Sequence, residues 1–197
     1  MKQFYSVMAL LLITATISVF GASPFGEFKV LNPVFENEDL KVVFSIGKAE
    51  GAEILALRIY NKTDRFVSIL WDESLITDNN GRAVRPIHSG IKFIFADRPQ
   101  VPTIIPPKSF IDDIMVPQSH IYYSDGWRVE PLSENVLERY FMISYKVDEI
   151  KKTLIGTVHL SYTPPAPGFS DEELALAVLG GLLGILIAWW ILSSMGL

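Results

Sequence analysis

Three histidines, His88, His120 and His159, are the side chains in this sequence best suited to acid-base or metal chemistry. No pair of them has the His-x-x-x-His or similar short spacing that zinc sites use, so we expect no metal centre and no cofactor. Ser89 follows His88 directly, which raises the hypothesis of a hydrolase with His88 as its base. The chain has no Gly-x-Ser-x-Gly elbow, and no residue stands out as the orienting acid. A hydrolase centred on His88 therefore stays an alternative, and we expect no catalytic residues.

Two acidic stretches carry oxygen ligands at close spacing. Asp78-Asn79-Asn80-Gly81 places side-chain oxygens before a glycine, as a calcium loop does, but Ile87 stands where that loop needs an acidic ligand. We predict a hairpin turn there instead. Asp112 and Asp113 fall in a predicted strand, where adjacent side chains point to opposite faces and cannot share one cation.

Three aromatic residues, Tyr122, Tyr123 and Trp127, flank the Asp125-Gly126 turn. Rings in this arrangement can stack on a sugar, which predicts a binding site for carbohydrate or another cell-envelope ligand. Packing of the rings on one another across a hairpin is the simpler interpretation.

Four prolines lie close together, and they are Pro99, Pro102, Pro106 and Pro107. Proline lacks a backbone N–H, so the four cannot all lie within a central strand. We predict a loop or a protected sheet edge. Its local PxxP spacing makes this segment a candidate docking surface for another protein.

The composition excludes several classes of site. The chain has no cysteine, which rules out disulfides, thiolate metal sites and cysteine nucleophiles. Its net charge is −5, and it has no basic stripe of the kind that displaces counterions from phosphates, so we expect no nucleic-acid partner. Asn61-Lys62-Thr63 is a glycosylation sequon, relevant only where exported proteins are glycosylated.

Both ends of the chain have the pattern of membrane-targeting segments. Residues 1–22 resemble a secretory signal peptide, with Lys2 before an apolar run, and an uncleaved signal anchor is the alternative. Residues 174–197 carry no charge and would form about 36 Å of helix, against a hydrocarbon core of about 30 Å. We therefore predict a single-pass transmembrane helix at 171–197, a proline-rich tether at 164–170, and a C-terminus in the cytoplasm.

Small residues recur every four positions within the predicted membrane helix, at Gly180, Gly184 and Ala188. Such a stripe lets a second helix approach closely. It predicts association with a partner helix or with a second copy.

The segment between the two ends, residues 24–163, has the pattern of an all-β domain. Alternating polarity or enrichment in β-branched and aromatic residues predicts strands at 40–47, 54–60, 66–71, 75–77, 83–87, 91–95, 111–116, 140–147 and 154–162. Only residues 132–138 favour a short helix. So many short strands indicate an immunoglobulin-like two-sheet sandwich, with a barrel as the alternative.

A resemblance supports the sandwich. An apolar strand ends in an Asn turn at 57–64, a hairpin turns at Asn-Gly within 74–81, and prolines precede the next strand at 105–109. This order, over residues 40–117, resembles immunoglobulin-like modules of exported bacterial membrane-anchored proteins. The resemblance implies a fold and a location on the periplasmic or extracellular side, and no activity.

These patterns together predict a membrane-tethered interaction or assembly module without catalytic activity. Its expected partners are the lipid bilayer and a protein, or a second copy of the chain through the transmembrane helix.

Overall fold

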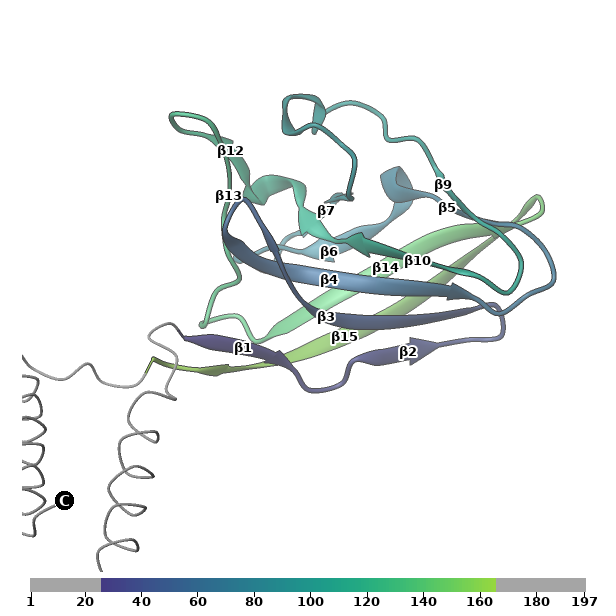
Figure 1. Ribbon diagram of the computed structural model, residues 1–197, viewed down its shortest axis with the longest axis horizontal. Helices are drawn as coiled ribbons and strands as arrows, with labels where there is room; N and C mark the ends of the chain where they lie inside the picture. The colour runs from purple at the N-terminus through teal and green to yellow at the C-terminus, as the bar shows by residue number, and fades with distance from the viewer. Residues whose placement is uncertain (1–25, 166–197) are drawn as a thin grey trace, which may run out of the picture. The chain divides into compact units, whose positions relative to one another are not determined.

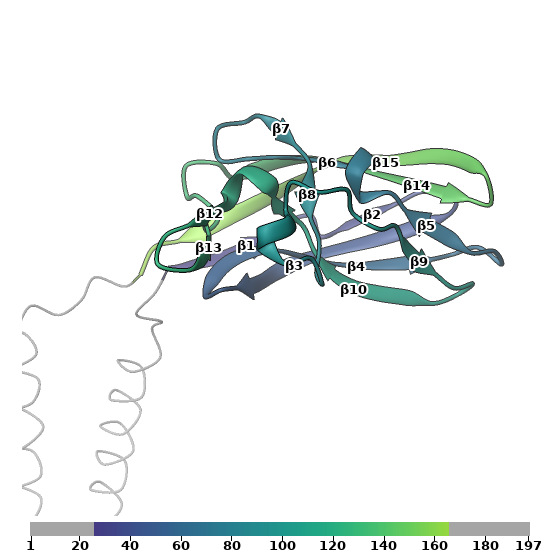
Figure 2. The same cartoon turned by 90° about the horizontal axis from the view of Figure 1, so that it is seen from above.

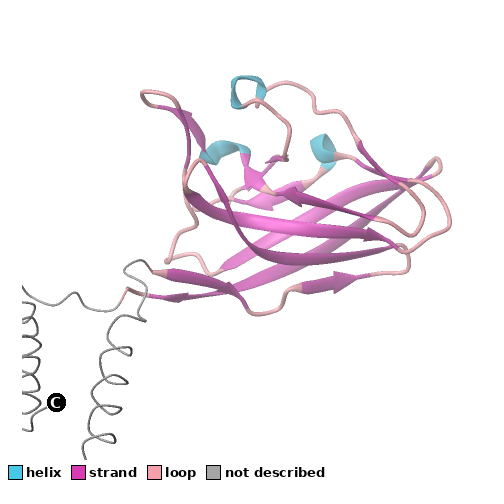
Figure 3. Ribbon diagram, in the orientation of Figure 1, coloured by secondary structure: helices cyan, strands magenta, loops and turns pink. Residues whose placement is uncertain are grey.

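The computed structural model describes residues 26–165, and this part of the chain is all-β (Figures 1 and 3). Besides strands it contains three single-turn 3-10 helices, η1 (Trp71–Glu73), η2 (Phe93–Phe95) and η3 (Gln118–His120). No helix within residues 26–165 is long and apolar enough to cross a membrane. The predicted signal peptide, the predicted transmembrane helix and most of the predicted tether lie outside the described residues.

Two main sheets with antiparallel pairing form the body of the domain. The seven-stranded sheet runs in the order β1 (Glu27–Val30), β15 (Ile150–Thr163), β14 (Glu138–Val147), β5 (Val67–Ile69) and β9 (Thr103–Ile105), and β14 also pairs with β6 (Leu75–Thr77), which pairs with β7 (Ala83–Val84). The four-stranded sheet runs in the order β10 (Phe110–Ile114), β4 (Ala52–Asn61), β3 (Leu40–Ala49) and β2 (Val34–Glu36).

Two two-stranded sheets complete the sheets of the described residues. β8 (Pro86–Ile87) pairs with β11 (Val116–Pro117), and β12 (Ile121–Tyr123) pairs with β13 (Trp127–Val129). In Figure 1 the β12–β13 hairpin projects from the upper side of the domain, whereas the start of β1 and the end of β15 lie on the lower side, and Figure 2 shows the hairpin from above.

The main hydrophobic core lies between the two main sheets, which form separate layers in Figure 2, and Ile54, Val116 and Val129 form a second, smaller apolar cluster. The predicted period of two is confirmed in β3, where every second side chain from Leu40 to Phe44 is buried. The longest strands of the other sheet, β14 and β15, contribute the opposite wall, and Ile143 and Val158 there have no exposed surface. Burial of one face per strand is what the alternating sequence pattern predicts.

An aromatic cluster fills one part of this core. The ring of Phe35 packs edge-to-face on Phe44 and on Phe141, with ring centroids 5.7 Å and 4.8 Å away. Gly156 lies beneath the Phe35 ring, and a Cβ at this position would come within 2.6 Å of that ring. Glycine at position 156 therefore lets the Phe35 ring pack closely against the backbone of β15.

Two element predictions are wrong. Residues 91–95 do not form a strand, because the chain leaves the sheets there and forms η2. Residues 132–138 do not form a helix, because their backbone pairs with strands: Leu132 N–H bonds Glu53 O, and Leu137 O accepts from Leu160 N–H. Short strands β1, β2 and β9 carry too few residues for a visible period.

Candidate functional site

His88, the predicted hydrolase base, lies in a half-buried cluster at the base of the proline-rich segment. Its ring stacks on Trp71, with centroids 4.8 Å apart and planes 9° apart. Its Nδ1 lies 3.4 Å from Asp113 Oδ2. Neither ring nitrogen makes a hydrogen bond within the described residues. The imidazole thus has a carboxylate neighbour and no hydroxyl partner.

Asp113 stands between His88 and the predicted nucleophile Ser89. Its Oδ1 accepts hydrogen bonds from the backbone N–H of Ser89, at 2.6 Å, and of Ile114, at 2.8 Å. Burial acts to raise the pKa of Asp113, yet His88 and the Ser89 and Ile114 bonds together hold that pKa below its usual value. A serine hydrolase needs a hydrogen bond between its histidine and the serine hydroxyl, and His88 makes none within the described residues.

Gln100 joins this cluster to the chain that follows. Its side-chain Nε2 donates to Pro86 O at 2.8 Å, and its backbone N–H donates to Asp72 Oδ2 at 2.9 Å. The side chain is buried although the residue lies in a polar, proline-rich stretch. Burial with hydrogen-bond partners fixes the start of that stretch on the domain.

The proline-rich segment, residues 99–107, is held at two further points. Trp71 Nε1 donates to Thr103 Oγ1 at 2.8 Å. The buried Asn61 donates from Nδ2 to Ile105 O and Pro106 O, at 3.1 Å and 2.9 Å. The nitrogen that glycosylation of the sequon would modify is therefore engaged inside the fold.

We call residues 99–107 the proline-rich edge, because β9 within it is the last strand of the seven-stranded sheet. β9 pairs with β5 on one side only, which confirms the predicted protected edge. Two β-branched side chains point outward from it, with 76% of Val101 and 61% of Ile104 exposed. Three of the four predicted docking prolines, Pro99, Pro102 and Pro106, are exposed and Pro107 is half-buried.

The three predicted aromatic residues come together on the β12–β13 hairpin. Tyr123 and Trp127 are direct cross-strand partners and pack edge-to-face with centroids 5.6 Å apart. The rings remain open to solvent, since 48% of Tyr122, 70% of Tyr123 and 37% of Trp127 are exposed. The predicted turn is present, with Asp125 and Gly126 at positive φ. We call residues 121–129 the aromatic hairpin.

Asn79 anchors the base of the aromatic hairpin. Its backbone N–H donates to His120 Nε2 at 3.1 Å, and its side-chain Nδ2 donates to Glu130 Oε1 at 2.7 Å. His120 immediately precedes β12, and Glu130 immediately follows β13. The backbone N–H of Glu130 also donates to His120 O at 2.8 Å. Both legs of the hairpin are thus tied to the turn that contains Asn79.

That turn, Asp78-Asn79-Asn80-Gly81, joins β6 to β7, as predicted. Burial would raise the pKa of Asp78, but backbone bonds from Arg82 and Asn80 and side-chain bonds from Ser119 and Arg82 lower it to about 2. The carboxylate therefore serves as the organising anion of the turn, and its bonds leave it no metal role.

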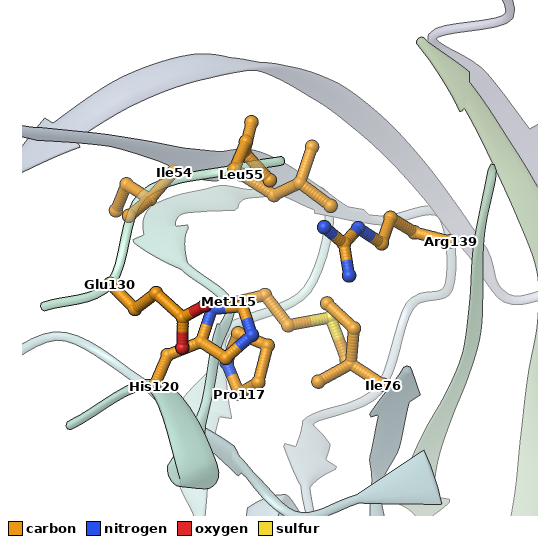
Figure 4. A pocket seen from close by; sticks show the side chains of 9 residues that line it. Ile54, Leu55, Ile76, Met115, Pro117, His120, Glu130 and Arg139 are labelled. Carbon is orange, nitrogen blue, oxygen red and sulfur yellow. The ribbon is translucent and has the colours of Figure 1, made fainter. Parts of the chain in front are cut away.

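Arg139 completes this buried polar cluster from strand β14. It has 1% of its surface exposed, and its guanidinium bonds Thr77 O, at 3.2 Å, and Asn79 Oδ1. Burial lowers the pKa of Arg139, and burial likewise lowers the pKa of His120, which stays neutral at pH 7. Figure 4 shows both side chains with Glu130 on the wall of a small cavity too narrow for a ligand larger than water.

Sequence reasoning missed this cluster. Arg139 occupies a position of β14 at which strand alternation predicts a buried apolar residue. A charged residue at such a position indicates a buried polar cluster. Gly180, Gly184 and Ala188 lie outside the described residues. Within residues 26–165 no group of three or more acidic or histidine side chains could hold a metal ion.

Asp112 and Asp113 point to opposite faces of β10, as predicted. Asp113 is buried against His88, whereas Asp112 is exposed and forms a two-point ion pair with Arg58 at 2.6 Å and 2.9 Å. His159, on the outer face of β15, lies 3.4 Å from Glu138 in an exposed pair. Arg58 and Asp112 line a pocket of the four-stranded sheet together with Ser45 and Tyr60.

Comparisons with models of protein families, with curated proteins and with solved structures found no match for this chain.

Proposed function

We propose that this chain is an exported protein held in a membrane by its C-terminal helix, and that its β-domain is a non-catalytic interaction or assembly module. The proposal takes the domain as an immunoglobulin-like sandwich, for which two antiparallel sheets around a main core give support. The signal-like residues 1–22 and the charge-free residues 174–197 support a periplasmic or extracellular domain with a cytoplasmic C-terminus.

The observation that carries the proposal is the proline-rich edge. It presents Val101 and Ile104 to solvent, while Gln100, Thr103 and Ile105 beside them are fastened to the domain by hydrogen bonds. A segment that is already ordered loses little conformational entropy on binding. The free energy gained by burying its exposed apolar side chains against a partner therefore adds to the affinity. We take Val101 and Ile104, two exposed apolar side chains on one ordered edge, as the proposed docking site.

The prolines also limit what the partner can do at this edge. Pro102 and Pro106 bracket β9 and offer no N–H, so a partner strand could pair with three residues at most. The proposed contact is therefore through side chains, with a protein that supplies an apolar surface. A second copy of this chain, associated through Gly180, Gly184 and Ala188, is the form of partner that the helix pattern favours.

The hydrolase alternative has less support. Asp113 lies near His88 through Oδ2, and its Oδ1 accepts the backbone N–H groups of Ser89 and Ile114. His88 makes no hydrogen bond to a hydroxyl within the described residues. The buried groups around Asp78 likewise bond one another. The chemistry-bearing side chains of the described residues thus serve to hold the exposed segments in place.

Photocrosslinking in native membranes tests the proposal. Benzoylphenylalanine replaces Ile104 in one variant and Ile155 in the other. Ile155 is an exposed isoleucine on the outer face of β15 in the same sheet, with 66% of its surface exposed. The two positions thus match in residue type and exposure and differ in the feature that the proposal uses.

The proposal expects a discrete protein adduct from Ile104→benzoylphenylalanine, and none from the control. An adduct with the mass of two chains would identify self-assembly, and another mass would identify a different partner. Only monomer from both variants would refute the interaction module.

A further inference from the structure

The aromatic hairpin is attached at both of its ends to the turn that contains Asp78. Before β12, Ser119 Oγ donates to Asp78 Oδ2 at 3.0 Å. The next residue, His120, accepts at Nε2 from the backbone N–H of Asn79, at 3.1 Å. After β13, Glu130 accepts from Asn79 Nδ2 at 2.7 Å. The position of the hairpin on the domain therefore depends on these few polar contacts.

One of these contacts requires a particular protonation state of His120. A ring nitrogen that accepts a hydrogen bond carries no proton, so the imidazole is neutral and has its proton on Nδ1. A proton on Nε2 would turn this acceptor into a donor that faces the N–H of Asn79. The hydrogen bond cannot form between two donors. Charging of the ring and loss of this attachment are therefore one event.

The surroundings of His120 oppose a charged ring. Only 3% of the residue is exposed, and the buried guanidinium of Arg139 lies on the wall of the same small cavity (Figure 4). Two carboxylates favour the charge, but Asp78 is already paired with Arg82, and Glu130 is exposed to solvent, which screens it. Burial accordingly lowers the pKa of this imidazole, with Arg139 reinforcing the shift and the two carboxylates opposing it. A protonated ring is therefore more stable in water than in its buried position.

The remaining attachment of the hairpin is small. Val129 of β13 is buried in the smaller apolar cluster with Ile54 and Val116, and Ile121 of β12 packs against that cluster. Beyond these residues β12 and β13 pair with each other as a separate two-stranded sheet. A segment with few buried contacts belongs to the part of a fold that opens at the lowest free-energy cost. Loss of the polar attachments can therefore free the hairpin while the two main sheets stay folded.

We propose that His120 is a pH-operated latch: the neutral ring holds the aromatic hairpin against the Asp78 turn, and protonation in mild acid releases the hairpin. An imidazole in water titrates near pH 6.5, so below about this pH the released state binds more protons than the latched state and gains population. Release changes how the exposed rings of the hairpin are presented, so their contacts become dependent on pH. The inference does not depend on the proposed membrane anchor or on the proline-rich edge.

Spin labelling of the detergent-solubilised full chain tests the latch. The chain has no native cysteine, so each label has a unique site. One variant carries Ser124→Cys at the hairpin tip, and its control carries Ile155→Cys, an exposed position on the outer face of β15. The readout is the mobility of each label in the electron paramagnetic resonance spectrum from about pH 8 to about pH 5.

The mobile fraction of the Ser124→Cys label is expected to rise several-fold as the pH falls, with no change at Ile155→Cys. Adding His120→Gln supplies an amide oxygen that accepts from the Asn79 N–H and does not titrate, so the hairpin label should stay immobile in acid. His159→Gln, at an exposed histidine of β15, is the matched control and should leave the rise intact. Absence of a rise, or an equal rise in both histidine variants, would overturn the latch.

A direct titration of the ring decides the question even if His120→Gln loosens the hairpin at every pH. The chain has three histidines, and the imidazole NMR signal of His120 is the one that disappears in His120→Gln. The latch predicts that this signal titrates with the same midpoint as the mobility of the Ser124→Cys label. A ring that stays neutral while the label becomes mobile contradicts the latch. Simultaneous mobility of the Ile155→Cys label also contradicts it, because that result indicates general unfolding.

Discussion

The proline-rich edge and the aromatic hairpin are built on the same plan, with exposed apolar side chains above a buried polar support. Their supports differ in chemistry. The edge is fastened by the amides of Gln100 and Asn61 and by the carboxylate of Asp72, which accepts from the Gln100 backbone N–H. The hairpin is fastened through a cluster that includes Asp78, His120 and Arg139. The hairpin support thus contains a buried arginine, whereas the edge support relies more on uncharged amides.

The comparison also separates what each segment can contact. The edge offers branched aliphatic side chains, which suit a complementary protein surface. The hairpin offers tyrosine and tryptophan, which combine an apolar ring with a polar group. The two segments therefore offer different contact chemistry on one domain.

Removing Arg139 should give the largest effect. Arg139→Met leaves Thr77 O and Asn79 Oδ1 without their donor inside the fold, and we expect a loss of about 3 kcal/mol in the free energy of unfolding. Denaturant unfolding of the detergent-solubilised full chain measures this change in the free energy of unfolding. The spin label at Ser124 should also become more mobile, because the hairpin support is lost.

Arg58→Met is the matched control for Arg139→Met. Arg58 makes an ion pair with Asp112 on the outer face of the four-stranded sheet, and both side chains are exposed. Solvent-exposed pairs contribute less than about 1 kcal/mol. Equal losses from the two variants would show that burial of Arg139 does not matter to the hairpin.

Gln100→Leu should have the next largest effect. It leaves Pro86 O without the Nε2 donor, and an unpaired buried group costs about 2 kcal/mol. The yield of the Ile104 crosslink should fall, while the mobility of the hairpin label stays constant. A simultaneous change at both segments would contradict independent supports.

Acid should weaken the hairpin support. Burial lowers the pKa of His120, with Glu130 and Asp78 opposing and Arg139 reinforcing that shift. The unfolded chain then binds more protons than the fold below about pH 6.5, so stability falls as the pH drops from 7 toward 5. His120→Gln should flatten this dependence in unfolding curves measured across the same range. An unchanged slope would show that His120 is not the responsible group.

The smallest effect on stability is expected at the hairpin tip. Tyr123→Ser with Trp127→Ser removes one edge-to-face pair of exposed rings, worth about 1 kcal/mol. The same pair of changes should leave the pH response of the label at Ser124 intact, because the hydrogen bond between His120 and Asn79 remains. Tyr140→Ser, at an exposed tyrosine of β14, is the control and should cost less stability. A large loss of stability at the tip would assign the rings to packing.

Much of the fold follows from local patterns in the sequence. Residues 40–44 alternate because one face of β3 meets the core, and the Asp78 and Asp125 turns carry the residues that such turns require. The helix expected at 132–138 fails because the backbone of Leu132 and Leu137 bonds to strands distant in sequence. Long-range pairing of this kind has no local signature.

The candidate surfaces were predictable, but their supports were not. Exposed prolines and clustered aromatic residues can be read from composition, as with Pro102 and Trp127. The contacts of Asn79 with Glu130, and of Arg139 with Thr77, join residues more than fifty positions apart. Only the folded sheets bring them together.

The most direct measurement of this account compares photocrosslinks from Ile104→benzoylphenylalanine and Ile155→benzoylphenylalanine in native membranes. The account predicts a discrete protein adduct from the first variant and none from the second. The same adducts from both variants, or none from the first, would contradict it.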